Sequence, residues 1–375
     1  MVVAHMRDHY PGASSTIDPW FQVVSGRSSA LFAVLAGLSI VLASTCTRSR
    51  ERPTLRTDAR AVLAARAVLV ATIGLLLGIF ADGIAVILTY YGLLFLCALP
   101  VLRWRARSLA LLAIVWAVAA PMVSHTLRIY LPDPSLDIPA PSSLSDPLGL
   151  ISELLVTGYY PVLTWATYLF AGMAIGRLDL RSRVMALRLA AGGALLAVAS
   201  VAVSALVTRS ARVQQSLLGG HDSPEVATWA ELSGVFSEGF YGTTPTGSWW
   251  WLAVWAPHSG SIVDLTHTVG CALAILGVVL LATSLLSRGG QRAVSVIFGA
   301  GAMTLTLYVV HVLVLALPPD WGWAHQISVH STVLASIGAL FSACRIQGPL
   351  EWLVSRASRT TALAGKTTAY PRIHS

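Results

Sequence analysis

Hydrophobic residues fill nine stretches of about twenty positions each, and more polar segments of varied length separate them. An α-helix rises ~1.5 Å per residue, so about twenty apolar residues cross the ~30 Å hydrocarbon core of a bilayer. The stretches do not alternate in polarity, as the strands of a membrane β-barrel would. The pattern therefore predicts an all-α, polytopic transmembrane helical bundle with nine complete spans. These are residues 28–47, 61–81, 83–102, 108–127, 154–176, 189–208, 265–287, 293–317 and 323–344.

The loops between the stretches alternate in charge. Arginine residues concentrate in the connections after the first, third, fifth and seventh predicted spans and in the chain beyond residue 344. Basic residues are retained in the cytoplasm, so these connections are predicted to lie inside. Residues 1–27, 81–83, 128–150, 209–264 and 318–322 are then extracytoplasmic. We expect a multi-pass protein of the cell (plasma) membrane, with the lipid bilayer as its partner and a cytoplasmic C-terminus.

The formal net charge of +8 follows from the same bias. Because the charges are dispersed over several loops, we expect no single basic face and no nucleic-acid binding. The four cysteines lie in or beside apolar stretches without CxxC spacing, which predicts neither a disulfide framework nor a metal site. The sequence also lacks Walker A, HExxH and GxSxG motifs. ATP-driven transport and metalloprotease chemistry therefore lose most of their support.

No internal repeat divides the chain. Residues 1–350 are predicted to form a single transmembrane domain, and residues 351–375 a partly disordered cytoplasmic tail. Residues 1–4 are apolar but too short to span a membrane, and they look like the last turn of a helix whose beginning is missing. We therefore expect the tail of a truncated first helix before the complete spans. The pattern is compatible with a homo-oligomer.

An aromatic cluster lies in the long outer loop 209–264, where Trp249, Trp250, Trp251 and Trp255 follow closely. Indole side chains favour the headgroup level of a membrane, so an interfacial belt is the simpler interpretation. A platform that stacks against a sugar beside an outer site is the alternative.

Polar residues in or beside apolar spans are costly and usually functional. Here they gather near one predicted depth, the outer membrane surface, whereas scattered residues would not share a level. Histidine exchanges a proton near neutral pH, which suits general acid–base catalysis and acyl transfer. The candidate catalytic residues are His5, Arg27, His258, Asp264, His267 and His311.

Several of these candidates also have a structural interpretation. Asp264 and His267 are three residues apart, so the carboxylate either holds the imidazole in one tautomer or merely caps the helix. His311 lies in an aliphatic run and should face the bundle interior, where structural hydrogen bonding and catalysis fit equally well. Arg27 is either an interfacial anchor or a positive group aimed at a developing oxyanion.

Two further arginines lie towards the cytoplasmic side. Arg66 is inside an apolar stretch and Arg177 closes another. Snorkelling of their long side chains to the membrane surface is the simpler interpretation. The alternative is that their guanidinium groups bind the phosphates of a coenzyme entering from the cytoplasm.

Short motifs along nearly the whole chain resemble a family. They are VAH at residues 3–5, GRSSALFAVLAG at 26–37, YYGLLF at 90–95, PHSG at 257–260 followed by Asp264, LTLYVVH at 305–311 and GPLE at 348–351. In these motifs the chain resembles bacterial membrane proteins of the YeiB type. Those proteins are similar in turn to the catalytic domain of heparan-α-glucosaminide N-acetyltransferase.

The resemblance implies transmembrane acyl transfer. Acetyl-CoA or another acyl-CoA would stay in the cytoplasm as donor, and a glycan or small-molecule acceptor would receive the acyl group outside. By the same resemblance, the histidine at the outer end of the first helix is His5, as general base or acyl carrier. The helix that should precede His5 is missing from this sequence.

Two other functions compete with acyl transfer. A transporter of a small solute would need polar groups at the bilayer midplane and interrupted helices in related halves. The polar residues here gather at one face instead, which argues against transport. The third hypothesis is an inactive family member or membrane scaffold, left without activity by the truncated first helix.

Overall fold

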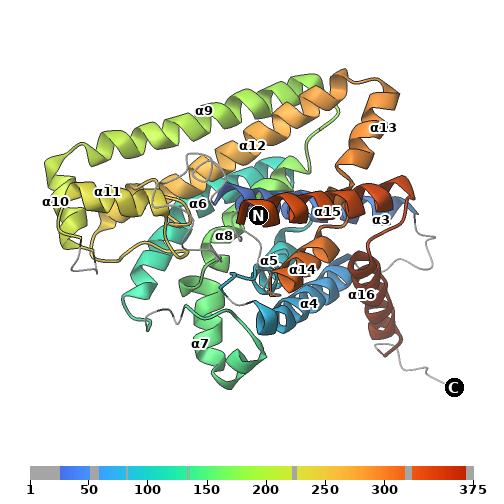
Figure 1. Cartoon of the computed structure of the whole chain (residues 1–375), viewed down its shortest axis with the longest axis horizontal. Coiled ribbons are helices and arrows are strands. Elements are labelled where there is room, and N and C mark those ends of the chain that lie inside the picture. The colour runs from blue at the N-terminus through green and yellow to red at the C-terminus, as the bar shows by residue number, and fades with distance from the viewer. Residues whose placement is uncertain are drawn as a thin grey trace.

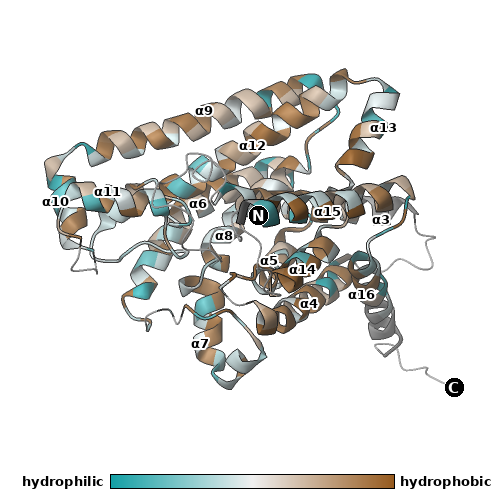
Figure 2. Cartoon of the chain, viewed as in Figure 1, coloured by the Kyte–Doolittle hydropathy of each residue, from teal (hydrophilic) through white to brown (hydrophobic). Residues whose placement is uncertain are grey.

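The computed structural model describes residues 26–50, 59–81, 83–132, 134, 136–221, 226–316 and 323–368, which form helices and loops and no β-strand. The all-α prediction is therefore confirmed. Six helices are long and apolar enough to cross a membrane. Figure 2 shows hydrophobic residues along much of their length, and the chain is a multi-pass membrane protein. The six are α3 (Arg27–Arg50), α4 (Ala59–Leu77), α6 (Ala106–Arg128), α9 (Arg183–Thr208), α12 (Ile262–Leu285) and α15 (Trp323–Ala343).

Three of the expected spans are short helices. Helices α5 (Leu88–Val101) and α8 (Val162–Ile175) have 14 residues each, and α14 (Thr304–Leu315) has 12. At ~1.5 Å per residue these helices are about 18–21 Å long, less than the ~30 Å of a hydrocarbon core. The number of nine complete crossings therefore stays a prediction.

The expected span 293–317 is not one continuous helix. Helix α13 (Arg288–Ile297) and a 3-10 turn (Gly299–Ala302) precede α14. Gly299 and Gly301 lie at this break, and glycine is unfavourable in a helix interior because it loses the most backbone entropy. A Cβ at Gly299 would also overlap the carbonyl oxygen of Gly338 in α15, so close packing requires glycine here.

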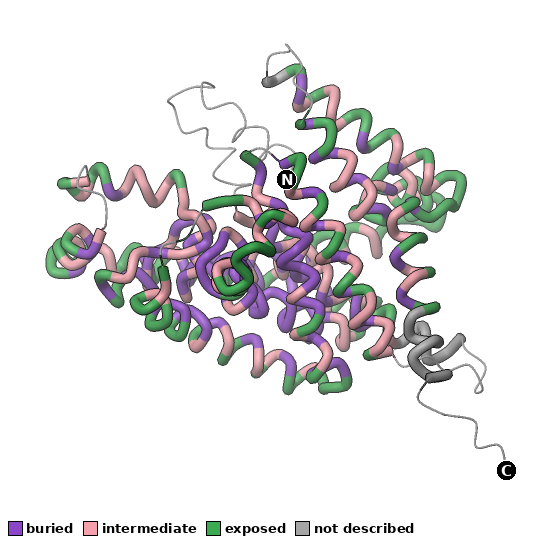
Figure 3. Tube along the Cα trace, turned by 90° about the horizontal axis from the view of Figure 1, so that it is seen from below, coloured by how far each residue is buried: buried purple, intermediate pink, exposed green. Residues whose placement is uncertain are grey.

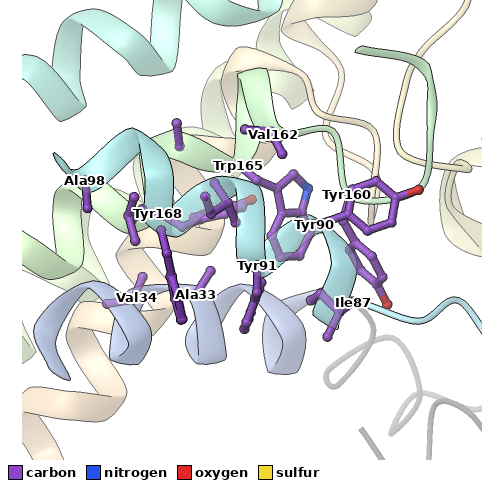
Figure 4. Close-up of a cluster of buried hydrophobic side chains, with 14 of the residues drawn as sticks. Ala33, Val34, Ile87, Tyr90, Tyr91, Ala98, Tyr160, Val162, Trp165 and Tyr168 are labelled. Carbon is purple, nitrogen blue, oxygen red and sulfur yellow. The ribbon is translucent and has the colours of Figure 1, made fainter. Parts of the chain in front are cut away.

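Helix α8 lies at the centre of the bundle. All its residues except Leu163 are buried, because α3, α5 and α6 pack around it. A helix that is apolar all round belongs in a protein core. Figure 3 shows this buried centre in purple, and Figure 4 shows side chains of α3, α5 and α8 meeting there, among them Val34, Tyr91 and Tyr168.

Glycines hold the long helices close together. Gly172 of α8 packs on the Val34 carbonyl of α3, and Gly193 of α9 packs on the Gly270 carbonyl of α12. Small residues let membrane helices approach until their backbones touch. Helices α9 and α12 consequently run side by side, as Figure 1 shows, and this pairing fixes the position of α12.

The described part of the long connection between α9 and α12 folds over the end of α9. It contains α10 (Ala211–Gly219), α11 (Trp229–Glu238) and a 3-10 turn (Trp249–Ala253) around a small core. Trp251 is fully buried in this core, whereas Trp249 and Trp250 remain 54% and 43% exposed. One tryptophan of the cluster therefore packs in the core and two lie at the surface. The fourth, Trp255, contacts Arg27 in the candidate site.

Residues 351–368 of the predicted tail lie in helix α16 (Pro349–Thr368). The Glu351 carboxylate in its first turn caps α14. It accepts hydrogen bonds from the backbone nitrogens of Leu305 and Thr306 at 2.7 and 3.1 Å, and from the Thr306 hydroxyl at 2.6 Å. These bonds satisfy amide groups that have no partner within the helix.

Glu351→Ala should therefore destabilise the protein by about 1–2 kcal/mol, the usual cost of removing an N-cap. The measurement is the thermal unfolding of the detergent-solubilised chain. Glu238→Ala, at an exposed carboxylate near the end of α11, is the control and should leave the midpoint unchanged. Equal midpoints for all three proteins would contradict the capping role.

Candidate active site

Arg27 begins α3 and meets His267, which lies in the second turn of α12. The Arg27 Nε donates a hydrogen bond to His267 Nε2 at 3.2 Å. His267 Nδ1 lies 3.0 Å from the carbonyl oxygen of Ala197 in α9, which can only accept. The proton of the neutral ring is therefore on Nδ1, and the lone pair of Nε2 faces Arg27. The Cys271 Sγ lies 3.5 Å from the same Nε2.

Asp264 is buried one turn before His267. Its carboxylate accepts a hydrogen bond from the Gly260 backbone nitrogen at 3.1 Å and one from the Thr268 hydroxyl at 3.2 Å. Ser261 is the N-cap of α12, because its hydroxyl accepts from the Asp264 backbone nitrogen at 2.9 Å. This arrangement differs from both interpretations that the spacing of Asp264 and His267 suggested. Ala197, rather than Asp264, fixes the His267 tautomer, and Asp264 orders the turn that leads into α12.

Trp255 completes the surroundings of Arg27. The guanidinium lies 5.4 Å from the centre of the indole ring, and the indole is 5.4 Å from the His267 ring. The positive charge also interacts electrostatically with Asp264 and His258. A purely interfacial anchor would direct its charge to the headgroups. Arg27 directs it into a group of titratable side chains instead.

His258 lies in the loop before α12 with a left-handed backbone, φ 55°. Its ring packs 4.6 Å from the Tyr159 ring. Its buried Nδ1 has no hydrogen-bond partner within the part of the chain that the structure describes. Burial and the nearby charge of Arg27 lower the His258 pKa from 6.5 to about 4. The ring is therefore neutral at pH 7.

This pKa predicts how stability depends on pH. Between pH 6.5 and about 4 the unfolded chain binds a proton at His258 that the folded chain does not, so stability falls as the pH falls through this window. His258→Gln should reduce, by a few degrees, the drop in unfolding temperature between pH 7.5 and pH 5. His325→Gln, at an exposed position on α15, should retain the drop of the unsubstituted protein. An unchanged drop in His258→Gln would show that the ring is protonated normally.

His311 pairs with a histidine of α15. Its Nδ1 lies 3.0 Å from Nε2 of His330 in α15, and its side chain is buried. Tyr308, one turn earlier, accepts a hydrogen bond from the Ile87 backbone nitrogen at 3.2 Å. The prediction that His311 faces the bundle interior agrees with this geometry. The assignment of His311 to the same site as Arg27, made from a common predicted depth, stays a prediction. His5 lies outside the described residues.

Arg66 and Arg177 contact α5 and the residue that follows it. Arg66 lies over the Phe95 ring at 5.8 Å and interacts electrostatically with Glu351. Arg177 donates to the Leu102 carbonyl oxygen at 2.5 Å, while its buried Nε has no hydrogen-bond partner among the described residues. Phe95 and Leu102 are two helical turns apart, about 10 Å along the helix. The structure therefore places both guanidinium groups along the C-terminal half of α5.

Sequence reasoning missed a neighbouring group of residues. Glu153 is buried in a π-helical turn (Glu153–Thr157), and Tyr159, Tyr160 and Tyr241 stack between this turn and His258. The sequence did offer a signal for this group. Glu153 directly precedes the apolar stretch 154–176, and Tyr159 and Tyr160 follow Gly158. Cys271 and Ala197 gave no signal, because a thiol and a backbone carbonyl in apolar helices look like packing.

A comparison with models of protein families shows to which family the chain belongs. The model for the catalytic domain of heparan-alpha-glucosaminide N-acetyltransferase matches residues 3–208, more than half of the chain. This chain belongs to that family. Neither curated proteins nor solved structures give a significant match.

The segment that matches the acetyltransferase family includes α3 to α9 and therefore Arg27, Arg66, Arg177 and Ala197. His258, Asp264 and His267 follow it. The hydrogen bonds of His267 to Arg27 and Ala197 join α12 to the matched segment. The candidate site is thus assembled across the boundary of the matched segment.

Proposed function

We propose that this protein is an integral membrane acyltransferase that moves an acyl group from cytoplasmic acyl-CoA to an extracytoplasmic acceptor. Its membership of an acetyltransferase family supports acetyl-CoA as the donor. A sugar or a glycan of the cell envelope is the acceptor that we propose, with the protein in the plasma membrane. The observation that carries the proposal is the positive group of Arg27, held between His267 and Trp255 beside a neutral His258.

Each residue of this group has a proposed role. The acceptor's hydroxyl or amine attacks the thioester carbonyl of acyl-CoA, which forms a negative oxygen on that carbon, and the acceptor loses a proton. When this intermediate collapses, the C–S bond breaks, an ester or amide remains on the acceptor, and coenzyme A leaves as a thiol after taking up a proton. Arg27 supplies the positive charge for the oxygen, in a site where donors placed in advance stabilise it most. His5 accepts the proton, and His258, which is neutral and has a buried Nδ1, is proposed to line the site and hydrogen-bond the acceptor. Asp264, His267 and His311 are proposed to line or support the site.

The donor's phosphates need positive groups on the cytoplasmic side. Arg177 suits this role, because its Nε is buried without a hydrogen-bond partner among the described residues. Arg66 lies on the same side of α5 and balances its charge against Glu351. We propose that both guanidinium groups hold the phosphate groups of acyl-CoA through charge-assisted hydrogen bonds.

The experiment follows radiolabel from acetyl-CoA to a panel of sugars, with the purified full chain in detergent. The expected result is labelled sugar, at a rate that His5→Ala reduces at least about 100-fold. His221→Ala, in the outer loop, is the control and should leave the rate unchanged. Absence of both acetyl-CoA binding and transfer would overturn the proposal. Solute uptake into proteoliposomes without any donor would favour a transporter instead.

A further inference from the structure

A group of aromatic rings and a carboxylate lies beside His258, away from Arg27. Tyr159 is its centre, with ring distances of 4.7 Å to Tyr241, 4.7 Å to Tyr160 and 4.6 Å to His258. Tyr160 is buried, and Figure 4 shows it beside Tyr90 in the core. Tyr159 and Tyr241 are only partly buried. The rings therefore form a continuous layer that runs from the core to an accessible edge at Tyr159 and Tyr241.

Glu153 adds a negative charge to this layer. It is 8% exposed, and its charge interacts with the hydroxyl groups of Tyr90 and Tyr241. Burial, together with the charges of Glu153 and Asp137, raises the pKa of Tyr241 to about 12. Tyr241 therefore keeps its proton and donates it to the Leu136 carbonyl oxygen at 3.2 Å. A buried carboxylate is costly without polar neighbours, so it is unusual in a part of the fold that only packs.

The backbone around this layer leaves no space for larger side chains. A Cβ at Gly158 would lie 2.6 Å from the Glu153 carbonyl oxygen, and one at Gly242 would lie 2.7 Å from that of Tyr159. Gly242 also has φ +83°, which other residues rarely adopt. A Cβ at Gly260 would in turn lie 2.8 Å from the Gly242 carbonyl oxygen. Since Gly260 donates to Asp264, the layer is held in a fixed position relative to the Arg27 group.

We infer that Tyr159, Tyr241 and Glu153 form the acceptor subsite, and that its ligand is a hexopyranose ring. Aromatic rings offer a flat apolar surface for the C–H face of a sugar, and a few placed polar groups fix its orientation. The Glu153 carboxylate accepts hydrogen bonds from a hydroxyl or ammonium group of that sugar. His258 packs against Tyr159 and interacts electrostatically with Arg27, so it connects the proposed sugar subsite with the proposed site of acyl transfer. This inference rests on the proposed function.

The test measures sugar binding without an acyl donor, so that it does not depend on turnover. Glucose and glucosamine are titrated against the full chain in detergent by saturation-transfer NMR. Glu153→Gln and Tyr241→Ala should each raise the Kd at least about tenfold, which corresponds to ~1.4 kcal/mol. Tyr241→Phe should change it little, because the ring remains. Tyr130→Ala, at a residue that is 81% exposed, is the control and should bind like the unsubstituted protein. A larger effect of Glu153→Gln on glucosamine than on glucose would identify an ammonium as the group that reaches the carboxylate.

Acetyl-CoA binding by the same samples shows whether each variant is folded. Unchanged sugar binding in folded Glu153→Gln and Tyr241→Ala would overturn the subsite, as would absence of sugar binding to the unsubstituted protein. If the unsubstituted protein binds sugar through these residues but transfers no label, the subsite stands and the proposed function fails. If it transfers label and the variants keep both affinity and rate, the function stands and the subsite fails.

Discussion

Arg27→Ala should lower the rate of acyl transfer about 100- to 1,000-fold, the usual effect of removing one group that stabilises an oxyanion. The substitution removes the positive charge next to the buried Asp264, and it removes the hydrogen bond that Nε donates to His267. Both changes act at the proposed reaction site. The measurement is the kcat for transfer of labelled acetyl groups, with the KM for acetyl-CoA as a second readout that should change little.

Two variants make this result specific. Arg27→Lys keeps the charge but lacks the planar group that lies over Trp255 and the Nε donor, so we expect an intermediate loss. Arg209→Ala removes an exposed arginine at the outer end of α9 and should leave the rate unchanged. A rate for Arg27→Ala within about threefold of the unsubstituted protein would remove Arg27 from the reaction site.

Gly193→Leu should have the largest effect on stability. A Cβ at Gly193 would overlap the Ala274 backbone nitrogen and lie 2.6 Å from the Gly270 carbonyl oxygen, so α9 and α12 would have to separate. Overpacking of this kind typically costs about 1–3 kcal/mol. Activity should fall as well, because the hydrogen bond between Ala197 and His267 crosses the same interface one turn away. Thermal unfolding and acyl transfer provide the two measurements.

The adjacent Gly192 is a matched control. It lies on the same helix, and a Cβ there would have no neighbour within 4 Å. Gly192→Leu should therefore leave the protein as stable as before or slightly more stable, because leucine favours a helix over glycine. If the two leucine variants unfolded at the same temperature, close packing between α9 and α12 would not be what stabilises this pair.

The helical class could be predicted because runs of about twenty apolar residues have few other structures available. The lengths of α5, α8 and α14 could not. Hydropathy measures only whether a residue avoids water, and a helix buried among other helices is as apolar as one that faces lipid. The sequence stretch 154–176 therefore looked like a complete span, although α8 occupies only Val162–Ile175.

The candidate site could be predicted in part for a similar reason. Topology gives the depth of a residue in the membrane, and depth indicated Arg27, His258, Asp264 and His267 together. It does not give lateral position, so depth alone could not indicate that His311 pairs with His330. The contact between Arg27 and His267 joins residues 240 positions apart, which spacing along the chain cannot indicate. Glu153 was missed because a carboxylate at the edge of a span usually marks a solvated boundary.

The shortness of α8 has a consequence for how the protein responds to its host membrane. Its 14 residues extend about 21 Å, and their burial keeps lipid chains away from the helix. Hydrophobic mismatch acts on helices that meet lipid, which tilt when bilayer thickness changes. The six long helices can tilt in this way while the inner helix keeps its length. In vesicles made from lipids with longer or shorter acyl chains, the six long helices should therefore change their tilt. The buried helix α8, which separates the two aqueous sides, should keep its length.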